Sequence, residues 1–264
     1  MQTIISKDNA KLKAVRALIR SKKDREKSGR FVIEGVRALS AMSGGSALPQ
    51  YSLKEVWVAD DVLDLATEFD VSVFSIPRDF MEQLSDCRTS QGILGVVNYT
   101  PAPMEINPEQ GRYLLLDRLK DPGNMGTLIR SAVAFGFDGV LLHGDCVEVF
   151  NPKTVRASMG ALPFCTFQAL EADCMDKTIL VQTLENLGYE LVTTVLRGGE
   201  NLYEMKFGPK VVLVIGNEAN GVSDEILSKA NRRLSIPMSG NVESLNAAVA
   251  GSICMSAVGR ASGV

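Results

Sequence analysis

The sequence predicts an α/β protein, with an open, mostly parallel sheet flanked by helices on both faces in its C-terminal part and a smaller α/β/α domain before it. Three observations lead to this fold class. Short apolar runs alternate with segments of helical periodicity along the whole chain. Two runs, Leu114–Leu116 and Val211–Ile215, are apolar at every position, which is typical of parallel strands buried on both faces. A proline-rich stretch at residues 100–108 separates the two halves.

The length and composition fit this prediction. The 264 residues are enough for two domains, and 45% hydrophobic with 22% charged residues excludes a disordered or collagen-like chain. The longest nearly uncharged stretch, residues 245–259, is shorter than the ~20 apolar residues that span a bilayer. No secretory signal is visible at the N-terminus. We therefore expect a cytoplasmic protein without a membrane partner.

Residues 1–100 are expected to form the smaller domain. It begins with a basic helix, and a further helix is expected over residues 61–69, with short helices before and after it. Its strands are expected at residues 31–34, 55–59, 71–76 and 92–97. Three prolines between residues 100 and 108 favour an extended chain, so we place a linker at residues 101–112.

Residues 113–264 are expected to form the larger domain. Its strands are expected at residues 113–117, 138–143, 164–167, 190–196, 210–216 and 233–237. Helical patterns lie between most of them, as in an open parallel sheet. Ligands of such sheets bind outside the carboxyl ends of the strands, so the loops that follow the strands are the places to look for a site.

The first candidate loop follows the strand at residues 113–117. Asp121 is suited to cap a helix and Pro122 to occupy its first position. This start would place Asn124 near the mouth of the helix and Arg130 further along it. Helix capping and a surface arginine would explain the same residues without any function.

The second candidate loop covers residues 215–225. Gly216 and Gly221 bracket Glu218, and glycines permit positive φ angles and close approach of a ligand to the main chain. A plain turn into a helix that starts at Ser223 is the alternative.

The third candidate loop, residues 234–246, precedes a helix of small residues. Ser244 or Asn246 can cap this helix. Ala247, Ala250 and Gly251 would let another backbone pack unusually close. Capping alone would also explain the polar residues.

Several familiar sites are disfavoured by the sequence. No strand is followed by G-x-G-x-x-G, and no Walker spacing occurs, which argues against dinucleotide and P-loop phosphate sites. His143, the only histidine, is expected at a strand end and not in a catalytic triad. The cysteines form no C-x-x-C pair and are expected to be reduced and buried, namely Cys87, Cys146, Cys165, Cys174 and Cys254. We therefore expect no metal site.

Taken together, the three loops resemble the three signature motifs of the SpoU/TrmH branch of the SPOUT RNA methyltransferases. The resemblance consists of N-x-G-x-x-x-R at residues 124–130, G-x-E-x-x-G at residues 216–221 and I-P-M…S-L-N at residues 236–246. Residues 31–37, F-V-I-E-G-V-R, resemble the substrate-binding domain that many of these enzymes carry.

The resemblance implies S-adenosylmethionine-dependent methylation of a ribose 2'-hydroxyl in RNA, with 23S rRNA favoured over tRNA. It also implies a homodimer and a deep trefoil knot in the catalytic domain. The catalytic residues it implies are Asn124, Arg130, Glu218, Ser244 and Asn246. The cofactor-binding residues it implies are Thr194, Val195, Leu196, Gly216, Asn217, Glu218, Gly221, Ile236, Met238, Ser244, Leu245, Asn246 and Ala247.

Arg130 is expected to contact the acceptor ribose or its phosphate. A guanidinium stays protonated up to pH ~12, which fits electrostatic stabilisation of a developing alkoxide better than a role as general base. The sequence leaves both roles open.

Charge is distributed unevenly along the chain. The first 37 residues hold 11 Lys or Arg against 4 Asp or Glu, although the whole chain has a net charge of −3. This imbalance indicates an anionic partner, and a solvated helix face is the alternative. The residues expected to bind RNA phosphates are Lys11, Lys13, Arg16, Arg20, Lys22, Lys23, Arg25, Arg30 and Arg37.

Other functions remain compatible with the sequence. The same loops could serve an α/β enzyme of another class that binds NAD or a nucleoside phosphate. The chain could be an RNA-binding assembly factor without catalysis, or a methyltransferase that acts on tRNA.

Overall fold

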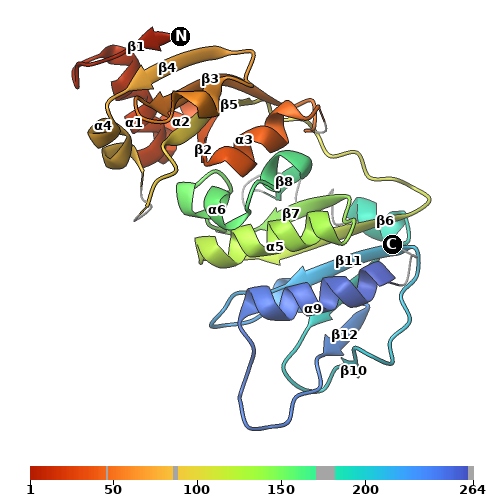
Figure 1. Cartoon of the computed structure of the whole chain (residues 1–264). Helices are drawn as coiled ribbons and strands as arrows, with labels where there is room; N and C mark the ends of the chain where they lie inside the picture. The colour runs from red at the N-terminus through yellow and green to blue at the C-terminus, as the bar shows by residue number, and fades with distance from the viewer. Residues whose placement is uncertain (46, 86–88, 171–181, 261–264) are drawn as a thin grey trace. The chain divides into compact units, whose positions relative to one another are not determined.

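A computed structural model of the chain describes residues 1–45, 47–85, 89–170 and 182–260 (Figure 1). Its contacts divide the chain into two units. Unit 1 comprises Met1–Ala102 and Glu148–Phe164, and unit 2 comprises Pro103–Val147 and Cys165–Val264. The sequence analysis assigned Glu148–Phe164 to the C-terminal domain. The structure groups this segment with the N-terminal unit, because Glu148 pairs with Arg25 and the ring of Phe150 stacks on Phe31.

Unit 1 contains a five-stranded sheet in the order β1-β4-β3-β5-β2. The strands are β1 (Gln2–Thr3), β2 (Arg30–Glu34), β3 (Tyr51–Ala59), β4 (Ser72–Ile76) and β5 (Ile93–Tyr99). Strands β1, β4 and β3 are parallel, and β5 runs antiparallel to both β3 and β2. The helices are α1 (Ala10–Arg20), α2 (Lys22–Ser28), α3 (Val36–Ser43), α4 (Arg78–Leu84) and α6 (Pro152–Ala157), with 3-10 turns η1 (Leu63–Ala66) and η2 (Leu162–Phe164).

Helices cover both faces of this sheet, as the α/β/α prediction requires. The apolar stripe of α1 is buried together with α4 and side chains of β3 and β4 in one core cluster. On the other face Leu39 of α3 lies over Gly95 of β5. The stripe consists of Leu12, Val15 and Leu18, the helical spacing seen in the sequence.

The helix predicted over residues 61–69 is wrong. Only the 3-10 turn η1 forms there, and Ala66 is its one buried residue. Thr67 ends the turn, because its hydroxyl donates a hydrogen bond to the carbonyl of Asp64 and so competes with a continuing helix.

Unit 2 contains a seven-stranded sheet in the order β10-β12-β9-β11-β6-β7-β8, in which every neighbouring pair is parallel. The predicted open parallel sheet is confirmed. The strands are β6 (Gly111–Asp117), β7 (Gly139–His143), β8 (Phe167–Leu170), β9 (Glu190–Thr194), β10 (Glu200–Asn201), β11 (Lys210–Ile215) and β12 (Arg232–Ser235). The helices are α5 (Pro122–Ala134), α8 (Asp224–Leu227) and α9 (Ala247–Arg260).

Two strands differ from the expectation in this unit. Strand β8 starts at Phe167, later than the predicted residue 164, because Leu162–Phe164 form the turn η2. The short edge strand β10 was not predicted, since two residues carry no alternation signal.

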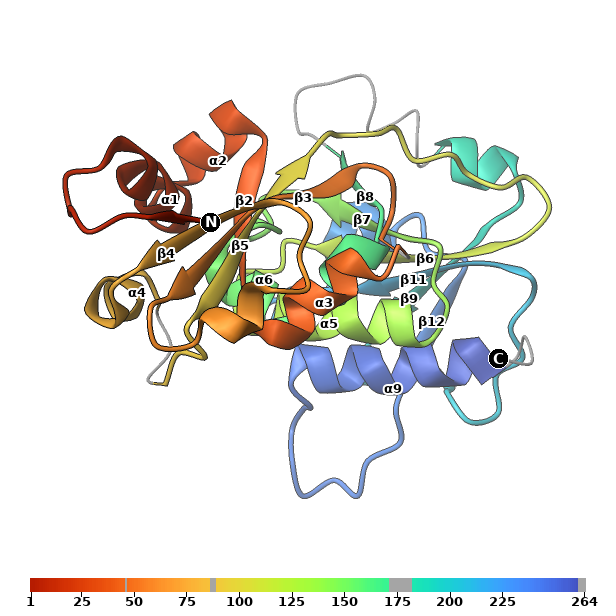
Figure 2. The same ribbon diagram turned by 45° about the horizontal axis from the view of Figure 1, so that its top comes forward.

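Helix α9 lies alongside α5 over the sheet, as both views show (Figures 1 and 2). A Cβ atom on Gly251 would overlap the side chain of Leu128 on α5, so this position needs a glycine. The hydroxyls of Ser131 and Ser252 share a hydrogen bond of 2.7 Å between the same helices. Of the small residues that the sequence singles out on α9, Gly251 is the one that the structure places against a side chain of α5.

Three of the five cysteines lie among the described residues. Cys165 and Cys254 are buried and Cys146 is half-buried, and burial raises the pKa of the Cys254 thiol to about 12. Cys87 and Cys174 lie outside the described residues. In the described part of the chain, no three His, Cys, Asp or Glu side chains gather to hold a metal ion, and no helix is long and apolar enough to cross a membrane.

Candidate active site

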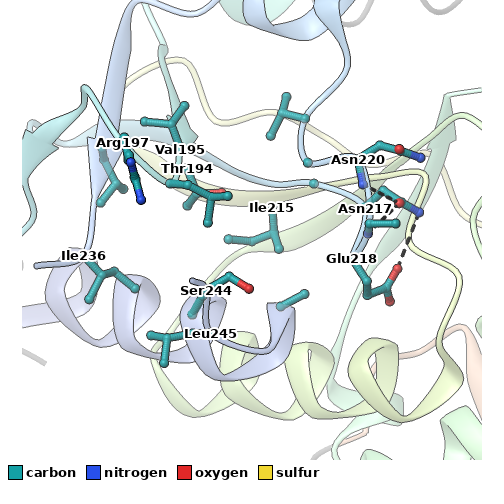
Figure 3. A pocket seen from close by; sticks show the side chains of 18 of the residues that line it. Thr194, Val195, Arg197, Ile215, Asn217, Glu218, Asn220, Ile236, Ser244 and Leu245 are labelled. Carbon is teal, nitrogen blue, oxygen red and sulfur yellow. Dashed lines mark hydrogen bonds between the residues drawn. The ribbon is translucent and has the colours of Figure 1, made fainter. Parts of the chain in front are cut away.

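A pocket of about 630 Å³ opens at the carboxyl edge of the sheet of unit 2 (Figure 3). Leu227 and three stretches of chain line it: residues 194–197 at the end of β9, residues 215–222 at the end of β11, and parts of residues 234–250, from β12 to α9. The strands β12, β9 and β11 are neighbours in the sheet, so their carboxyl ends bring these stretches together.

Every predicted cofactor-binding residue except Asn246 lines this pocket. Ser244 and Glu218, which were also predicted to act in catalysis, are among the lining residues. Sequence reasoning missed two charged residues of the lining, Arg197 and Glu243. Each directly adjoins a predicted residue, Leu196 or Ser244, so a wider window along the chain would have found them.

The loop after β11 depends on its two glycines. Gly216 is buried, and a Cβ atom there would overlap the carbonyl carbon of Gly221. Gly221 has φ +68°, a left-handed conformation that favours glycine. Asn217 joins the two ends of the turn: its N–H donates to the carbonyl of Gly221 at 3.0 Å, and the Gly221 N–H donates back at 2.9 Å. The expected positive φ is found at Gly221, and the space beside Gly216 is taken by the backbone of Gly221.

Glu218 ties this loop to the first candidate loop. Its Oε1 accepts hydrogen bonds from Asn124 Nδ2 at 3.0 Å and from the Asp121 N–H at 3.1 Å. Its Oε2 accepts from the Lys120 N–H at 3.3 Å. Burial alone would raise the pKa of Glu218, but these hydrogen bonds outweigh it and hold the pKa below its usual value. The group is therefore an ionised carboxylate at neutral pH.

Asn124 connects Glu218 to the third loop. It is buried at the start of α5, where Asp121 caps the helix by accepting from the Asn124 N–H at 2.7 Å. Asn246 Nδ2 donates to Asn124 Oδ1 at 2.9 Å, and Asn246 Oδ1 accepts from the N–H of Ala248, which caps α9. The three motifs thus meet in one chain of hydrogen bonds through Asn246, Asn124 and Glu218.

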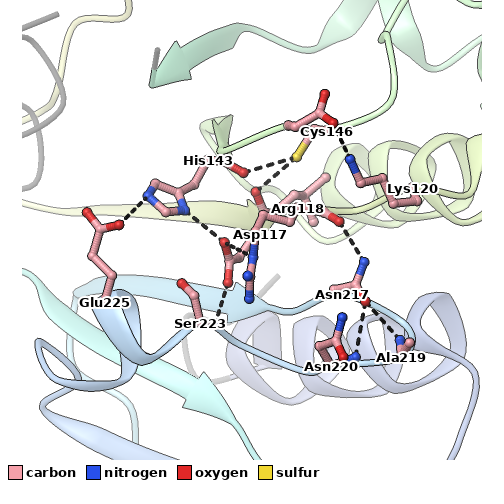
Figure 4. Close-up of polar contacts among 12 residues, drawn as sticks. Asp117, Arg118, Lys120, His143, Cys146, Asn217, Ala219, Asn220, Ser223 and Glu225 are labelled. Carbon is pink, nitrogen blue, oxygen red and sulfur yellow. Dashed lines mark hydrogen bonds and ion pairs between the residues drawn. The ribbon is translucent and has the colours of Figure 1, made fainter. Parts of the chain in front are cut away.

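A second set of contacts, centred on Asp117, holds the same loops in place (Figure 4). Asp117, at the end of β6, is fully buried and accepts from His143 Nδ1 at 2.8 Å and from the Ser223 N–H at 2.6 Å. Burial would raise the pKa of Asp117, yet the bonds from His143 and Ser223 lower it. The carbonyl of Arg118 accepts from Asn217 Nδ2 at 2.8 Å. His143 is the last residue of β7, as expected, and orients this carboxylate.

Arg130 is not part of the pocket within a single chain. It lies on α5 beyond Asn124, its side chain is exposed, and it forms no hydrogen bond or ion pair with any residue that the structure describes. Of the five predicted catalytic residues, four are close together and Arg130 stands apart.

The predicted RNA-binding residues of α1 and α2 are mostly exposed, with one correction. Arg25 is only 5% exposed, and its guanidinium forms a bidentate ion pair with Glu148 at 2.6 and 2.5 Å. It also donates to the carbonyl of Leu18 at 2.7 Å. Arg25 is a core residue that fixes the Glu148–Phe164 segment, so the expectation that it binds RNA is wrong.

Some of the other cations have partners of their own. Lys13 pairs with Asp8 at 2.8 Å and Lys22 with Glu26 at 3.5 Å, both at the surface, where such pairs contribute little to stability. Lys11 Nζ lies 4.2 Å from the centroid of the Phe74 ring, and Arg30 donates to Asn98. Arg16, Arg20, Lys23 and Arg37 form no ion pair with any other described residue.

Comparison with known proteins assigns the chain to a family. The model of the SpoU rRNA methylase family matches residues 111–256, which contain all three loops. The chain belongs to this family. A second model, the MRM3-like substrate binding domain, matches residues 9–95.

Several methyltransferases resemble the chain over almost its full length. The 23S rRNA (guanosine(2553)-2'-O)-methyltransferase RlmP of Bacillus subtilis is 30% identical, covering 96% of this chain and 97% of its own. An rRNA methyltransferase of Sinorhizobium meliloti, solved with bound AdoMet, has a TM-score of 0.83 at 28% identity and covers 98% of this chain and 97% of its own. AviRb of Streptomyces viridochromogenes, solved in complex with AdoMet, has a TM-score of 0.82 at 26% identity and covers 96% and 97%.

Proposed function

We propose that this protein transfers the methyl group of S-adenosylmethionine to a ribose 2'-hydroxyl of ribosomal RNA, with large-subunit rRNA as the substrate. The observation that carries the proposal is the hydrogen-bonded chain Asn246–Asn124–Glu218, which joins all three family motifs beside one pocket. The names of the relatives, among them RlmP, support the choice of reaction and RNA.

The pocket fits S-adenosylmethionine in size and lining. Its volume of about 630 Å³ lies within the ~300–1,000 Å³ that small-molecule sites usually have. Val195, Leu196, Ile236 and Leu245 supply apolar walls for a nucleoside base. The turn formed by Gly216 and Gly221 brings main chain to the edge of the pocket, where an adenosine group would meet backbone polar groups.

The charges of the pocket favour a cationic donor over a dinucleotide. Two carboxylates, Glu218 and Glu243, line the pocket and Arg197 is the single cation among the residues that the structure places there. Figure 3 shows Arg197 well apart from Glu218. A sulfonium is attracted by such carboxylates, whereas the two phosphates of NAD would be repelled. The bound cofactor would supply a methyl group that is already activated for displacement.

The residues of the chain then have to orient the acceptor and stabilise its charge. Glu218 is a poor proton acceptor, since its oxygens are occupied and its pKa is lowered. We assign it the role of holding Asn124 and the loops in place. Arg130, exposed and unpaired among the described residues, would contact the acceptor ribose or phosphate and stabilise the developing alkoxide.

The remaining parts of the proposal concern the whole protein. Residues 1–100 would act as the RNA substrate-binding domain, as the matching model of that name supports, and residues 113–264 as the catalytic domain. We also propose that the enzyme is a homodimer with a trefoil knot formed by the chain around α9, and that it acts in the cytoplasm, where its rRNA substrate would be assembled.

Two measurements with the purified protein test this function. Calorimetry should show that S-adenosylhomocysteine binds with a 1:1 ratio per chain and that NAD does not bind. Transfer of a labelled methyl group should be seen with unmodified large-subunit rRNA and be absent with tRNA. Binding of NAD in place of S-adenosylhomocysteine would support the other enzyme class, and cofactor binding without transfer to any RNA would support the assembly-factor alternative.

A further inference from the structure

A second cavity, of about 230 Å³, lies within unit 1 and has no role in the proposed reaction. One wall is the end of β2 and the start of α3, residues 33–38. The other wall is residues 155–163, the segment that follows β7 in the chain but packs in unit 1. Ala38, Val155, Leu162 and Pro163 make much of the lining apolar.

The polar rim of this cavity is held in a fixed arrangement. Gln91 Oε1 accepts a hydrogen bond from the Val36 N–H at 2.9 Å, which fixes the start of α3. Glu34 Oε1 accepts from Ser85 Oγ at 2.5 Å and from Ser90 Oγ at 3.0 Å. Apolar space with a fixed polar rim suits a nucleobase, because the faces of a base are apolar and its edges form hydrogen bonds.

The turn at Met159 presents an apolar side chain at this cavity. Met159 has φ +51°, which is unfavourable for a residue with a side chain, and it is 56% exposed. The next residue, Gly160, has φ +85°, and a Cβ atom there would lie 3.3 Å from the Cα of Ala38. The tight packing of Gly160 on α3 thus keeps the turn strained and leaves the Met159 thioether available to cover a flat ligand.

Two cations, Arg37 and Arg156, and one carboxylate, Glu34, line the cavity, so its lining has a positive net charge. Arg37, in the first turn of α3, is exposed and has no hydrogen bond or ion pair with a described residue. Arg156 lines the same cavity from α6. Charge complementarity therefore selects a ligand that joins a flat base to a phosphate.

We propose that this cavity binds one unpaired nucleotide of the RNA substrate, with its base between the apolar walls and its phosphate at Arg37. Proteins that recognise RNA sequence commonly take up unstacked bases of loops and bulges in this way, because bases inside an A-form helix are inaccessible. The choice of RNA as the source of the nucleotide rests on the proposed function.

The first test compares RNA hairpins that differ by one bulged nucleotide, with each of the four bases at the bulge. For at least one base, the full-length protein saturated with S-adenosylhomocysteine should bind the bulged hairpin at least fivefold more tightly than the unbulged one. Thr89→Trp, which places an indole at the exposed edge of the cavity, should abolish this preference. Equal binding of all hairpins, or a preference that survives in T89W, would overturn the proposal.

The second test isolates the phosphate contact. Arg37→Ala should lower the slope of log affinity against log salt for the bulged hairpin by about 0.7 to 0.9, the effect of one lost phosphate contact. Lys153→Ala is the matched control, because Lys153 is an exposed cation of α6 that does not line the cavity, and its slope should be unchanged. Equal slopes for R37A and K153A would contradict the role of Arg37.

The third test separates a nucleotide of RNA from smaller ligands. With a 13C label on the methionine methyl groups, the Met159 signal, identified by its loss in M159L, should shift with the bulged hairpin more than with a mononucleotide at equal concentration. An equally large shift of the Met159 signal with inorganic phosphate would show that the cavity is only an anion site. A response to mononucleotides alone would indicate that the ligand is a free nucleotide. Either result overturns the proposal. S-adenosylhomocysteine affinity should stay normal in T89W, so failure here is distinct from failure of the methyltransferase assignment.

Discussion

At the scale of single residues, the site is built from polar side chains whose hydrogen-bonding capacity is already used. Glu218 accepts from four donors, and Asn124 joins it to Asn246. Such a network holds loop backbones in place, and it leaves substrate chemistry to groups with free capacity. Arg130 belongs to the first family motif, and its guanidinium has such free capacity among the described residues.

Replacing Glu218 tests the network. Glu218→Gln removes the charge and puts an NH2 group against backbone donors, so we expect a cost of about 1.5–3 kcal/mol and a tenfold or larger loss of S-adenosylhomocysteine affinity. The lowered pKa adds a pH signature: the stabilisation is complete above the usual value of 4.5 and is lost as the pH falls through the lower folded-state value. The difference in Tm between wild type and variant, measured from pH 7 to 3, should therefore be constant above pH ~5 and shrink below it. A pH-independent difference would show that charge plays no part.

Replacing Arg130 tests its role in the reaction. Arg130→Lys keeps the charge but loses the forked guanidinium, so turnover should fall about a hundredfold or more while S-adenosylhomocysteine affinity changes less than twofold. Arg233→Lys, at an exposed position of β12, is the control and should leave both values unchanged. Single-turnover kinetics with saturating cofactor measures the effect. Near-normal turnover of R130K would show that the guanidinium of Arg130 takes no part in the reaction.

At the scale of elements, the strand order brings three loops together, and glycines determine how closely their backbones approach. Much of this could be predicted from the sequence. The apolar runs of β6 and β11 and the cap at Asp121 were strong local signals, and the glycine spacing indicated a tight loop. The exposed position of Arg130 agrees with the alternative of a surface arginine. Its absence from the pocket could not be predicted, because this depends on how α5 packs beside the three loops.

The loop after β11 gives a prediction at this scale. Gly216→Ala would place a methyl group against the backbone of Gly221, so we expect a loss of about 1–3 kcal/mol of stability and of cofactor binding. Gly208→Ala is the control, since a Cβ atom there meets nothing within 4 Å. Urea denaturation and calorimetry on both variants measure the difference, and equal behaviour of the two would refute the close approach.

At the scale of the whole molecule, the chain divides differently from its linear order. Residues 148–164 follow β7 of the catalytic sheet yet belong to unit 1. No local pattern in the sequence indicates this, because the contacts that decide it join residues more than a hundred positions apart: Arg25 with Glu148 and Phe31 with Phe150. Arg25 lies in a basic segment of the sequence, and the residue that pairs with it is far away in the chain. It was therefore predicted to bind RNA, although it is a core residue.

The ion pair gives a prediction about how unit 1 is held together. Arg25→Met leaves the carboxylate of Glu148 largely buried and unpaired, so the free energy of unfolding should fall by about 3–5 kcal/mol. Lys23→Met, at an exposed position of the same helix, should change it by less than 0.5 kcal/mol or so. If chemical denaturation shows equal effects for the two variants, Arg25 behaves as a surface cation and its ion pair does not stabilise unit 1.

We propose that the pocket and the Asn246–Asn124–Glu218 network serve methyl transfer to a ribose hydroxyl of rRNA. Nucleoside mass spectrometry tests it most directly, with unmodified large-subunit rRNA incubated with S-adenosylmethionine and either the wild-type protein or Asn124→Ala. We predict one new 2'-O-methylnucleoside, absent with the variant. A methyl group on a base, or rRNA with no new modified nucleoside, would contradict the account.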